Sequence, residues 1–307
     1  MSLSVSSETL RGPAPVLLIG AGRMGGLIAR RLLERGIALH VFDPDQTAVA
    51  RCVSAGATAA RFERVKALDY EKALLCLPDP AAVRTFIELW LSERPRRPDK
   101  RSAVADLTTV APGFARNASA DLATVGISYL DAPVSGGEPG AASGDLAIMV
   151  GGSAADFEAL APLLEHIGNT VRHVGAAGTG SLLKAINQYV YLTYNYVFAQ
   201  GLRMAREAGL PQDIGLEILR RGAAGHPLID ARIRDAIADP AKKGFPLKRC
   251  LKDLGFLELG ADIDPDVTDI YRLVRDRLQE SVDSGKGELD ILALSGRPEF
   301  QPQRGGV

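Results

Sequence analysis

The sequence lacks any strong imbalance of charge. Its 36 Lys and Arg residues nearly balance its 37 Asp and Glu residues, so the formal net charge over 307 residues is −1. The charged residues are also spread along the chain, whereas partners such as nucleic acid or an anionic membrane favour a concentrated basic patch. We therefore expect neither nucleic acid nor a membrane as a partner, and we expect a small-molecule ligand instead.

Cysteine and histidine are scarce as well. Cys52, Cys76 and Cys250 are odd in number and far apart, and they include no Cys-x-x-Cys pair. This usage is typical of a reducing compartment in which the thiols are structural. The four histidines lack the spacing to cysteine, histidine or carboxylate residues that metal ligands show, so we expect no metal site.

The beginning of the chain lacks the basic and then apolar segments of a secretory signal peptide. Residues 1–12 are polar and rich in serine, which predicts a disordered tail. Together with the cysteine usage, this favours a cytoplasmic protein. The chain is also longer than one hydrophobic core usually supports, so we expect two domains.

A glycine-rich motif follows the first predicted strand. Residues 14–20 form a short apolar run typical of a buried parallel strand, and the run leads directly into Gly20-Ala-Gly-Arg-Met-Gly25. A helical pattern comes next, then a second predicted strand at 37–42 with Asp43 at its end. The order of strand, glycine turn, helix, strand and acid predicts a dinucleotide-binding fold.

Each part of this motif has a physical role in binding a dinucleotide. Gly20 permits the tight turn, Gly22 lets the backbone approach the pyrophosphate, and Gly25 lets the helix pack against the strand. The phosphates would meet a helix N-terminus, which favours anions. Asp43 would bind the adenosine ribose and repel a 2′-phosphate, which favours NAD over NADP. A glycine turn in another nucleotide-binding or ligand-free sheet is the alternative.

Strands and helices continue to alternate after the second strand. Further strands are predicted at 72–77, 102–107, 127–131 and 146–150. Ligands of open parallel sheets bind outside the carboxyl ends of the strands. Leu77, Pro78 and Thr109 are therefore candidates to line the cofactor, and ordinary turns are the alternative.

A second glycine-rich loop runs from Asp131 to Gly140 and carries one hydroxyl, at Ser135. Consecutive glycines free the N–H groups of Gly136 and Gly137 to point into a concavity. Such an arrangement suits a carboxylate, whereas composition alone is equally compatible with a surface loop.

Lys184 stands near the start of a helix in the last part of the chain. No residue from 185 to 202 is charged, which suggests that this helix is buried on most sides. Asn187 and Gln188 share a helical face with the lysine. Because buried polar groups cost free energy unless they find partners, a ligand is one candidate partner, and a solvated lysine is the alternative.

The signals for strands disappear beyond about residue 175, and the remaining chain has a helical pattern. We therefore predict a cofactor domain at 13–175 and an all-helical domain at 176–307. Within the second domain, Lys252 and Asp253 would by composition alone belong to a charged helix surface.

Four motifs resemble, in order, those of the β-hydroxyacid dehydrogenase family, which includes 3-hydroxyisobutyrate dehydrogenase and tartronate semialdehyde reductase. They are Gly-x-Gly-x-Met-Gly at 20–25, Asp-x-Pro-Val-Ser-Gly-Gly at 131–137, Gly-x-Gly-x-x-x-Lys-x-x-Asn at 178–187, and Lys-Asp at 252–253. The resemblance covers the whole chain beyond the tail. It implies an α/β fold with a Rossmann-type doubly wound domain, joined by a long helix to an all-α domain that forms a homodimer or homotetramer.

The resemblance also implies an NAD(P)-dependent oxidoreductase that interconverts a small 3-hydroxy acid and its semialdehyde. Lys184 would be the catalytic residue, donating a proton to the developing alkoxide in reduction and accepting it in oxidation. The cofactor contacts are expected at Gly20, Gly22, Arg23, Met24, Gly25, Asp43, Leu77, Pro78, Thr109 and Lys252. The substrate contacts are expected at Ser135, Gly136, Gly137, Asn187 and Gln188.

The chain departs from the family pattern at three places. Gln188 stands where a second Asn is usual, which leaves the substrate open. Arg249 stands three residues before Lys252, where the family usually has an apolar residue. The segment Asp290-Ile-Leu-Ala293 stands where the family has Asp-x-Ser-Ala.

Three rival functions have different sequence requirements. An imine reductase usually replaces the lysine that is present here as Lys184. A 6-phosphogluconate dehydrogenase usually has His at the position of Ile186, and its chain is longer than this one. A non-catalytic dinucleotide-binding regulatory protein would be expected to have lost Lys184 or the glycine turn.

Overall fold

A computed structural model describes residues 14–93, 102–227, 230, 232–234, 244–258 and 269–297. The predicted tail at residues 1–12 lies outside these ranges. The chain divides into two compact units, Met1–Lys184 and Ala185–Val307.

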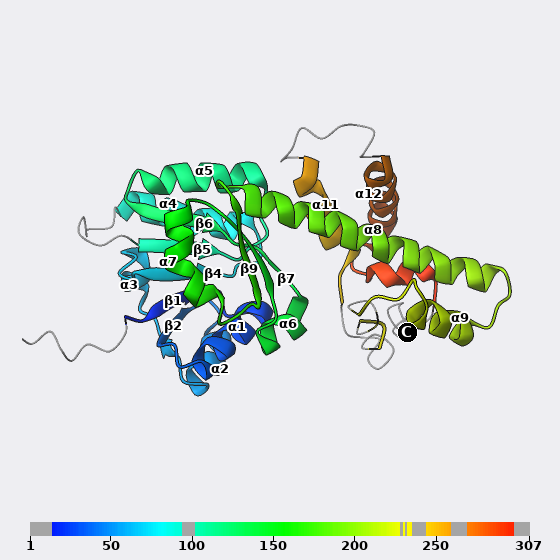
Figure 1. The fold of residues 1–307 in the computed structure, drawn as a ribbon, viewed down its shortest axis with the longest axis horizontal. Helices are drawn as coiled ribbons and strands as arrows, with labels where there is room; N and C mark the ends of the chain where they lie inside the picture. The colour runs from blue at the N-terminus through cyan, green and yellow to red at the C-terminus, as the bar shows by residue number, and fades with distance from the viewer. Residues whose placement is uncertain are drawn as a thin grey trace, which may run out of the picture. The chain divides into compact units, whose positions relative to one another are not determined.

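A mixed sheet forms the centre of the first unit (Figure 1). Among the residues that the structure describes, its strands are β1 (Val16–Ile19), β2 (Leu39–Phe42), β3 (Thr58–Ala59), β4 (Lys72–Leu75), β5 (Ser102–Asp106), β6 (Ile127–Asp131), β7 (Val134–Ser135), β8 (Ala147–Gly151) and β9 (Thr170–Gly175). Strands β3-β2-β1-β4-β5-β6 are parallel in that order, β8 is antiparallel to β6 and β7, and β9 is parallel to β8. The parallel part has the strand order of a doubly wound fold, which confirms the predicted fold class.

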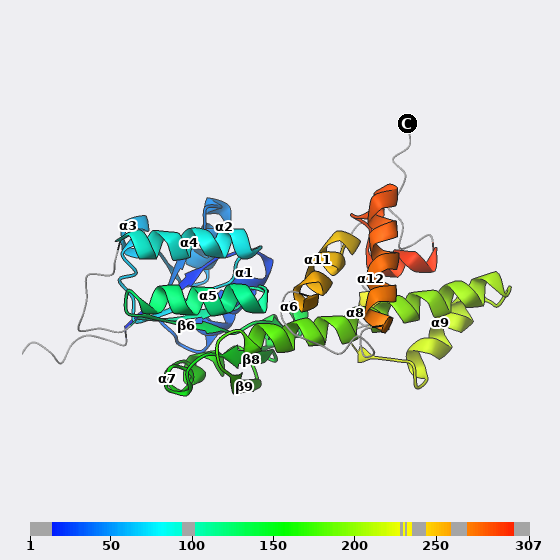
Figure 2. The same cartoon turned by 90° about the horizontal axis from the view of Figure 1, so that it is seen from above.

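Helices cover both faces of this sheet. They are α1 (Arg23–Glu34), α2 (Gln46–Ser54), α3 (Phe62–Lys66), α4 (Pro80–Glu93), α5 (Pro112–Ala123), α6 (Gly137–Ser143) and α7 (Ala154–Leu164). Leu18 of β1 packs in one core with α1, α2, α6 and α7, whereas Leu17 and Ile19 pack in the other with α3, α4 and α5. Figure 2 shows α4 and α5 side by side on that second face. Burial on both faces explains why the strand is a continuous apolar run.

The second unit is helical in the residues that the structure describes. Helix α8 (Thr179–Glu207) begins in the first unit and continues into the second. The other elements are α9 (Gln212–Arg221), α11 (Leu247–Glu258), α12 (Asp269–Ser281), the π-helical turn η2 (Val282–Lys286) and the 3-10 helix η3 (Ile291–Ser295). Apart from an isolated bridge between Pro246 and Asp290, these ranges contain no strand pairing, which confirms the predicted all-α part.

The burial of α8 differs from the prediction. Ile186, Val190 and Val197 are exposed, so the expectation that the uncharged run is buried on most sides is wrong for this part of the helix. A homodimer or homotetramer formed through the helical domain would cover such side chains, and that assembly stays a prediction. Among the described helices, none is both long and apolar enough to cross a membrane.

Candidate cofactor and active site

The turn between β1 and α1 is shaped by close backbone contacts. Gly20 has φ +97°, and a Cβ atom there would lie 2.2 Å from the Cys76 carbonyl oxygen. A Cβ atom on Gly25 would lie 1.9 Å from the Gly20 carbonyl oxygen. A Cβ atom on Gly22 would meet no described atom within 4 Å. The turn thus requires glycine at two positions and leaves open space at the third, where a phosphate could approach.

The start of α1 is suited to an anion. Gly22 is the N-cap residue, and no side chain among the described residues caps this end. The first N–H groups of a helix lack partners within the helix, and the helix dipole attracts negative charge there. The open space at Gly22 and these free donors together fit the pyrophosphate of a dinucleotide.

Asp43 follows β2 and faces the same turn. Its Oδ2 accepts a hydrogen bond from the Ala21 N–H at 2.6 Å, and its Oδ1 accepts one from the Asp45 N–H at 2.8 Å. A carboxylate has about four acceptor positions, so it retains capacity for the hydroxyls of a ribose. Asp45 caps α2 by accepting from the Thr47 N–H at 2.9 Å. Two carboxylates, those of Asp43 and Asp45, therefore follow β2, and Asp43 is the one bonded to the glycine turn.

The ends of β4 and β5 are joined by a hydrogen bond between their loops. The Leu77 N–H donates to Thr108 Oγ1 at 3.0 Å, and the Thr108 N–H donates to Asp106 Oδ1 at 2.9 Å. Leu77 and Thr109 are half-buried and Pro78 is exposed. The structure therefore brings these predicted cofactor residues to the same edge of the sheet as the glycine turn.

Asp106 was not predicted as a site residue. It is completely buried, and Tyr129 donates its hydroxyl proton to Asp106 Oδ2 at 2.7 Å. Burial raises the pKa of Asp106 to about 6, although the hydrogen bonds from Thr108 and Tyr129 oppose that shift. By accepting the Thr108 N–H, this buried carboxyl group holds the loop after β5 in place.

The predicted glycine loop at Ser135 has a regular structure. Ser135 belongs to β7 and pairs with Ala147 of β8, and the chain then enters α6 through Gly136 and Gly137 with φ values of +132° and +63°. The predicted loop thus contains a strand and a short helix, because the edge of β8 supplies hydrogen-bond partners for β7.

The start of α6 lies beside the glycine turn. Figure 1 shows α6 next to α1, and Arg23 of α1 forms an ion pair with Glu138 of α6 at 2.5 Å. The predicted cofactor residue Arg23 therefore contacts the helix that begins at the predicted substrate residue Gly137. The sequence motifs did not identify Glu138 as a residue of the site.

Lys184 is buried, with only 7% of its surface exposed. It lies on α8, whose first turn is bonded to the end of β6 through Asp131. Asp131 Oδ1 accepts from the Gly178 N–H at 2.8 Å, and Oδ2 accepts from the Ser181 N–H at 2.7 Å. Lys184 thus lies about one helical turn beyond the point where α8 is bonded to the carboxyl end of β6.

The predicted residues of the second unit lie on α8 and α11. Asn187 is half-buried, whereas Gln188 is buried and donates its amide to Asp253 Oδ2 at 2.9 Å. Lys252 Nζ lies 3.8 Å from Asp253 Oδ1 and 5.8 Å from the centre of the Phe256 ring. The motif residue Asp253 is thus the link between Gln188 and α11.

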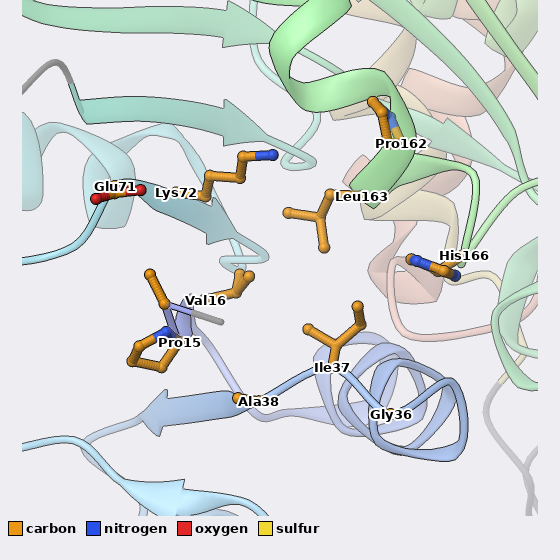
Figure 3. Close-up of a pocket in the computed structure, with 11 residues that line it drawn as sticks. Pro15, Val16, Gly36, Ile37, Ala38, Glu71, Lys72, Pro162, Leu163 and His166 are labelled. Atoms are coloured by element: carbon orange, nitrogen blue, oxygen red, sulfur yellow. The ribbon is translucent and has the colours of Figure 1, made fainter. Parts of the chain in front are cut away.

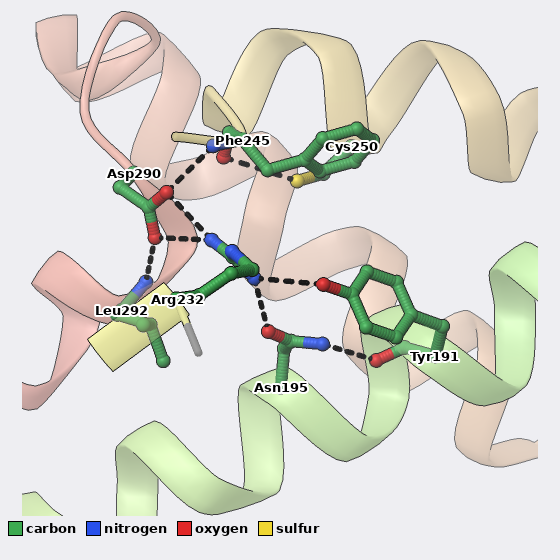
Figure 4. A network of polar contacts seen from close by, with 7 residues as sticks. All are labelled: Tyr191, Asn195, Arg232, Phe245, Cys250, Asp290 and Leu292. Atoms are coloured by element: carbon green, nitrogen blue, oxygen red, sulfur yellow. Dashed lines mark hydrogen bonds and ion pairs between the residues drawn. The ribbon is translucent and has the colours of Figure 1, made fainter. Parts of the chain in front are cut away.

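A second polar network in this unit surrounds Arg232 (Figure 4). Its Nη2 donates to both oxygens of Asp290, at 2.7 and 2.6 Å, and its Nη1 donates to the Tyr191 hydroxyl at 3.1 Å. Asp290 also accepts from the backbone N–H groups of Phe245 at 2.6 Å and Leu292 at 2.8 Å. The network joins α8 to the segments around Phe245 and η3. It holds in place Tyr191, the residue one turn beyond Asn187 and Gln188.

A hollow of about 330 Å³, whose lining is drawn in Figure 3, lies at the amino ends of β1 and β4, whereas the glycine turn follows the carboxyl end of β1. Its walls come from the amino ends of β1 and β4, the residues before β2, and the end of α7. It contains none of the predicted site residues. Among the described His, Cys, Asp and Glu side chains, no group is arranged to hold a metal ion.

Comparison with known proteins gives the family. Residues 15–175 match the family model of the NAD binding domain of 6-phosphogluconate dehydrogenase, and residues 178–294 match that of the NAD-binding domain of NADP-dependent 3-hydroxyisobutyrate dehydrogenase. The chain is 30% identical to the NAD-dependent L-serine dehydrogenase of Pseudomonas aeruginosa, over 94% of this chain and 99% of that protein. The chain belongs to the β-hydroxyacid dehydrogenase family.

Two further similarities agree with membership of the β-hydroxyacid dehydrogenase family. The 3-sulfolactaldehyde reductase of Escherichia coli is 31% identical over 69% of this chain and 71% of that protein. The solved structure of 3-hydroxyisobutyrate dehydrogenase from Salmonella typhimurium has the same fold, with a TM-score of 0.79 and 24% identity over 92% of this chain and 99% of that one. As a β-hydroxyacid dehydrogenase, the protein is an NAD(P)-dependent enzyme that acts on CH–OH groups.

Proposed function

We propose that this enzyme interconverts a small, carboxylate-bearing 3-hydroxy acid and its semialdehyde, with NAD as the preferred cofactor and Lys184 as the general acid and base. The proposal depends most on one observation, the burial of Lys184 on a helix whose start is bonded to the cofactor edge of the sheet. The names of the relatives, which act on L-serine and on sulfolactaldehyde, support small substrates of this kind. We place the division between the cofactor domain and the helical domain near residue 175.

The bound nicotinamide would supply the hydride in reduction and accept it in oxidation. Lys184 would donate a proton to the substrate oxygen as that oxygen gains negative charge, and it would take the proton back in oxidation. Asn187, one turn further along α8, would hydrogen-bond and orient the substrate. The Ser135 hydroxyl and the N–H groups of Gly136 and Gly137 would bind its carboxylate.

The cofactor contacts follow from the edge of the sheet and from α11. The phosphates would bind at the start of α1, the ribose at Asp43, and the remainder along the loops after β4 and β5. The proposed contacts are Gly20, Gly22, Arg23, Met24, Gly25, Asp43, Leu77, Pro78, Thr109 and Lys252. For Gln188, the hydrogen bond to Asp253 supports an indirect role, in which the amide holds α11 and hence Lys252 in place.

A substrate panel tests the proposed reaction. The wild-type enzyme is assayed with 3-hydroxyisobutyrate, L-serine, glycerate and 3-hydroxypropionate, each with NAD and with NADP. We expect saturable turnover of at least one of these acids and a higher kcat/KM with NAD. Cofactor binding without turnover of any acid would favour the non-catalytic regulatory alternative, and turnover of cyclic imines alone would favour the imine reductase alternative.

Replacing Asp43 by alanine is expected to remove the preference for NAD. The change deletes a charged acceptor for the ribose hydroxyls, and such hydrogen bonds contribute about 1.5–3 kcal/mol, so kcat/KM with NAD should fall roughly ten- to hundredfold. Activity with NADP should fall less, because the repulsion of a 2′-phosphate is also removed.

The matched control for this prediction is Asp45→Ala. Asp45 carries the same charge two residues later but caps α2. If the control lowered the use of NAD as much as Asp43→Ala, or if the wild type preferred NADP, the ribose assignment would be wrong.

A further inference from the structure

One buried carboxylate joins the start of α8 to the end of β6. The Asp131 carboxylate accepts hydrogen bonds from the backbone N–H groups of Gly178, which precedes the helix, and of Ser181, its third residue. Such N–H groups have no partner within a helix, and they need one from another element when they are buried. Asp131 itself has no exposed surface. The side chain of a strand thus caps the helix that carries Lys184.

Two glycines bring the same helix into direct backbone contact with the sheet. A Cβ atom on Gly180 would lie 2.3 Å from the Met149 carbonyl oxygen and 2.6 Å from that of Asp131. A Cβ atom on Gly151 would lie 2.5 Å from Asp131 Oδ1. Backbone atoms on both sides leave no room for a side chain. The first turn of α8 therefore packs with its backbone directly against the ends of β6 and β8.

The anchored N–H groups favour an ionised Asp131. Burial raises the pKa of this carboxyl group above its ordinary value, and the hydrogen bonds from the Gly178 and Ser181 backbones oppose that rise. Negative charge at the start of a helix also interacts favourably with the helix dipole. Asparagine has nearly the same shape, but it presents an NH2 group to one of the two N–H donors. One buried N–H group would then lose its acceptor.

We propose that Asp131 is a positioning residue that sets the place of the Lys184 ammonium group in the reaction. Lys184 lies three residues after Ser181, about one helical turn from the anchored N–H group. A shift of the first turn therefore moves the lysine with it. Misplacement of a reacting group by about 1 Å can lower the rate a hundredfold. The inference rests on the proposed role of Lys184.

The test compares Asp131→Asn with the wild type, using the acid that the substrate panel identifies. Enzyme concentrations are counted as NADH-binding sites from a fluorescence titration, so loss of folded protein does not count as loss of rate. We expect kcat per site to fall by roughly 10- to 100-fold and the Kd of NADH to stay within about twofold of the wild type. An unchanged kcat per site would overturn the proposal.

A double-mutant cycle with Lys184→Ala separates positioning from a general structural effect. If Asp131 acts through the lysine, adding Asp131→Asn to Lys184→Ala will lower kcat no further. A merely structural role would lower kcat by the same factor in both backgrounds, and that result would contradict the proposal. If instead Lys184→Ala alone kept full activity, the proposed function would fail before the inference was reached.

The matched control is Asp156→Asn, at the start of α7. Asp156 accepts from the hydroxyls of Ser128 at 2.8 Å and Ser153 at 2.6 Å, and its helix carries no proposed site residue. We expect its kcat per site to stay within about twofold of the wild type.

Gly180→Ala provides a second variant with Asp131 intact. Its Cβ atom would displace the start of α8, and we expect the same loss of kcat per site. If neither Asp131→Asn nor Gly180→Ala yielded protein that binds NADH, the contact would be required for the fold rather than for placing the lysine. That outcome too would count against the proposal.

Discussion

Replacing Lys184 by alanine is expected to lower kcat by about 10²- to 10⁴-fold in both reaction directions, the range that a positioned general acid or base contributes. The substrate oxygen gains negative charge in reduction, and without the ammonium group only water could supply the proton. Because Lys184 is separate from the glycine turn and from Asp43, the Kd of NADH should change little. Steady-state kinetics and NADH titration measure the two quantities.

A second variant at Lys184 tests whether catalysis needs proton transfer or only a positive charge, and a surface lysine serves as the control. Lys184→Arg keeps a positive charge, but a guanidinium does not release its proton at working pH, so this variant should also be nearly inactive. Lys66→Ala removes a surface lysine that pairs with Glu93 at 2.6 Å, and it should keep wild-type activity. Full activity in Lys184→Ala, or substantial activity in Lys184→Arg, would contradict the acid/base role.

The parallel core of the first unit could be predicted from the sequence because its signals are local. A run such as 14–20 has the apolar pattern of a strand buried on both faces, and the glycine turn that follows has fixed spacing. Strands β3 and β7 have two residues each, too few for any periodicity to be recognised. Their existence depends on the neighbouring strand edges that they meet, β2 and β8.

The supporting residues of the site could not be predicted in the same way. Asp106 and Asp131 lie opposite each other in the register of β5 and β6, and that register appears only when the sheet is formed. The same holds for Gln188 and Asp253, which are 65 positions apart. Motif spacing identifies residues that approach a ligand together in one loop. Asp131 and Asp253 belong to such motifs, but the spacing does not show that their side chains hold α8 and α11 in place.

Replacing Asp290 by alanine is expected to destabilise the second unit by about 3–5 kcal/mol, the usual cost of removing one partner from a buried ion pair. Asp290 and Arg232 are 14% and 20% exposed. Burial lowers the pKa of Arg232, and its polar partners, Asp290 first among them, together raise it by more. A guanidinium keeps its proton in proteins even without a partner, so Arg232 stays charged after the substitution. The backbone N–H groups of Phe245 and Leu292, whose hydrogen bonds are partly buried, would also lose their acceptor. Urea denaturation followed by circular dichroism measures the change.

A surface variant and a double variant test whether the loss of stability comes from the unpaired charge of Arg232. Glu288→Ala breaks the exposed ion pair with Lys248 and should cost less than about 1 kcal/mol. Combining Arg232→Met with Asp290→Ala should cost less than the sum of the single changes, because no charge is then left unpaired in the interior. If Asp290→Ala cost no more than Glu288→Ala, the Arg232 network would not hold the helical unit together. The ordering of Tyr191 on α8 would then need another cause.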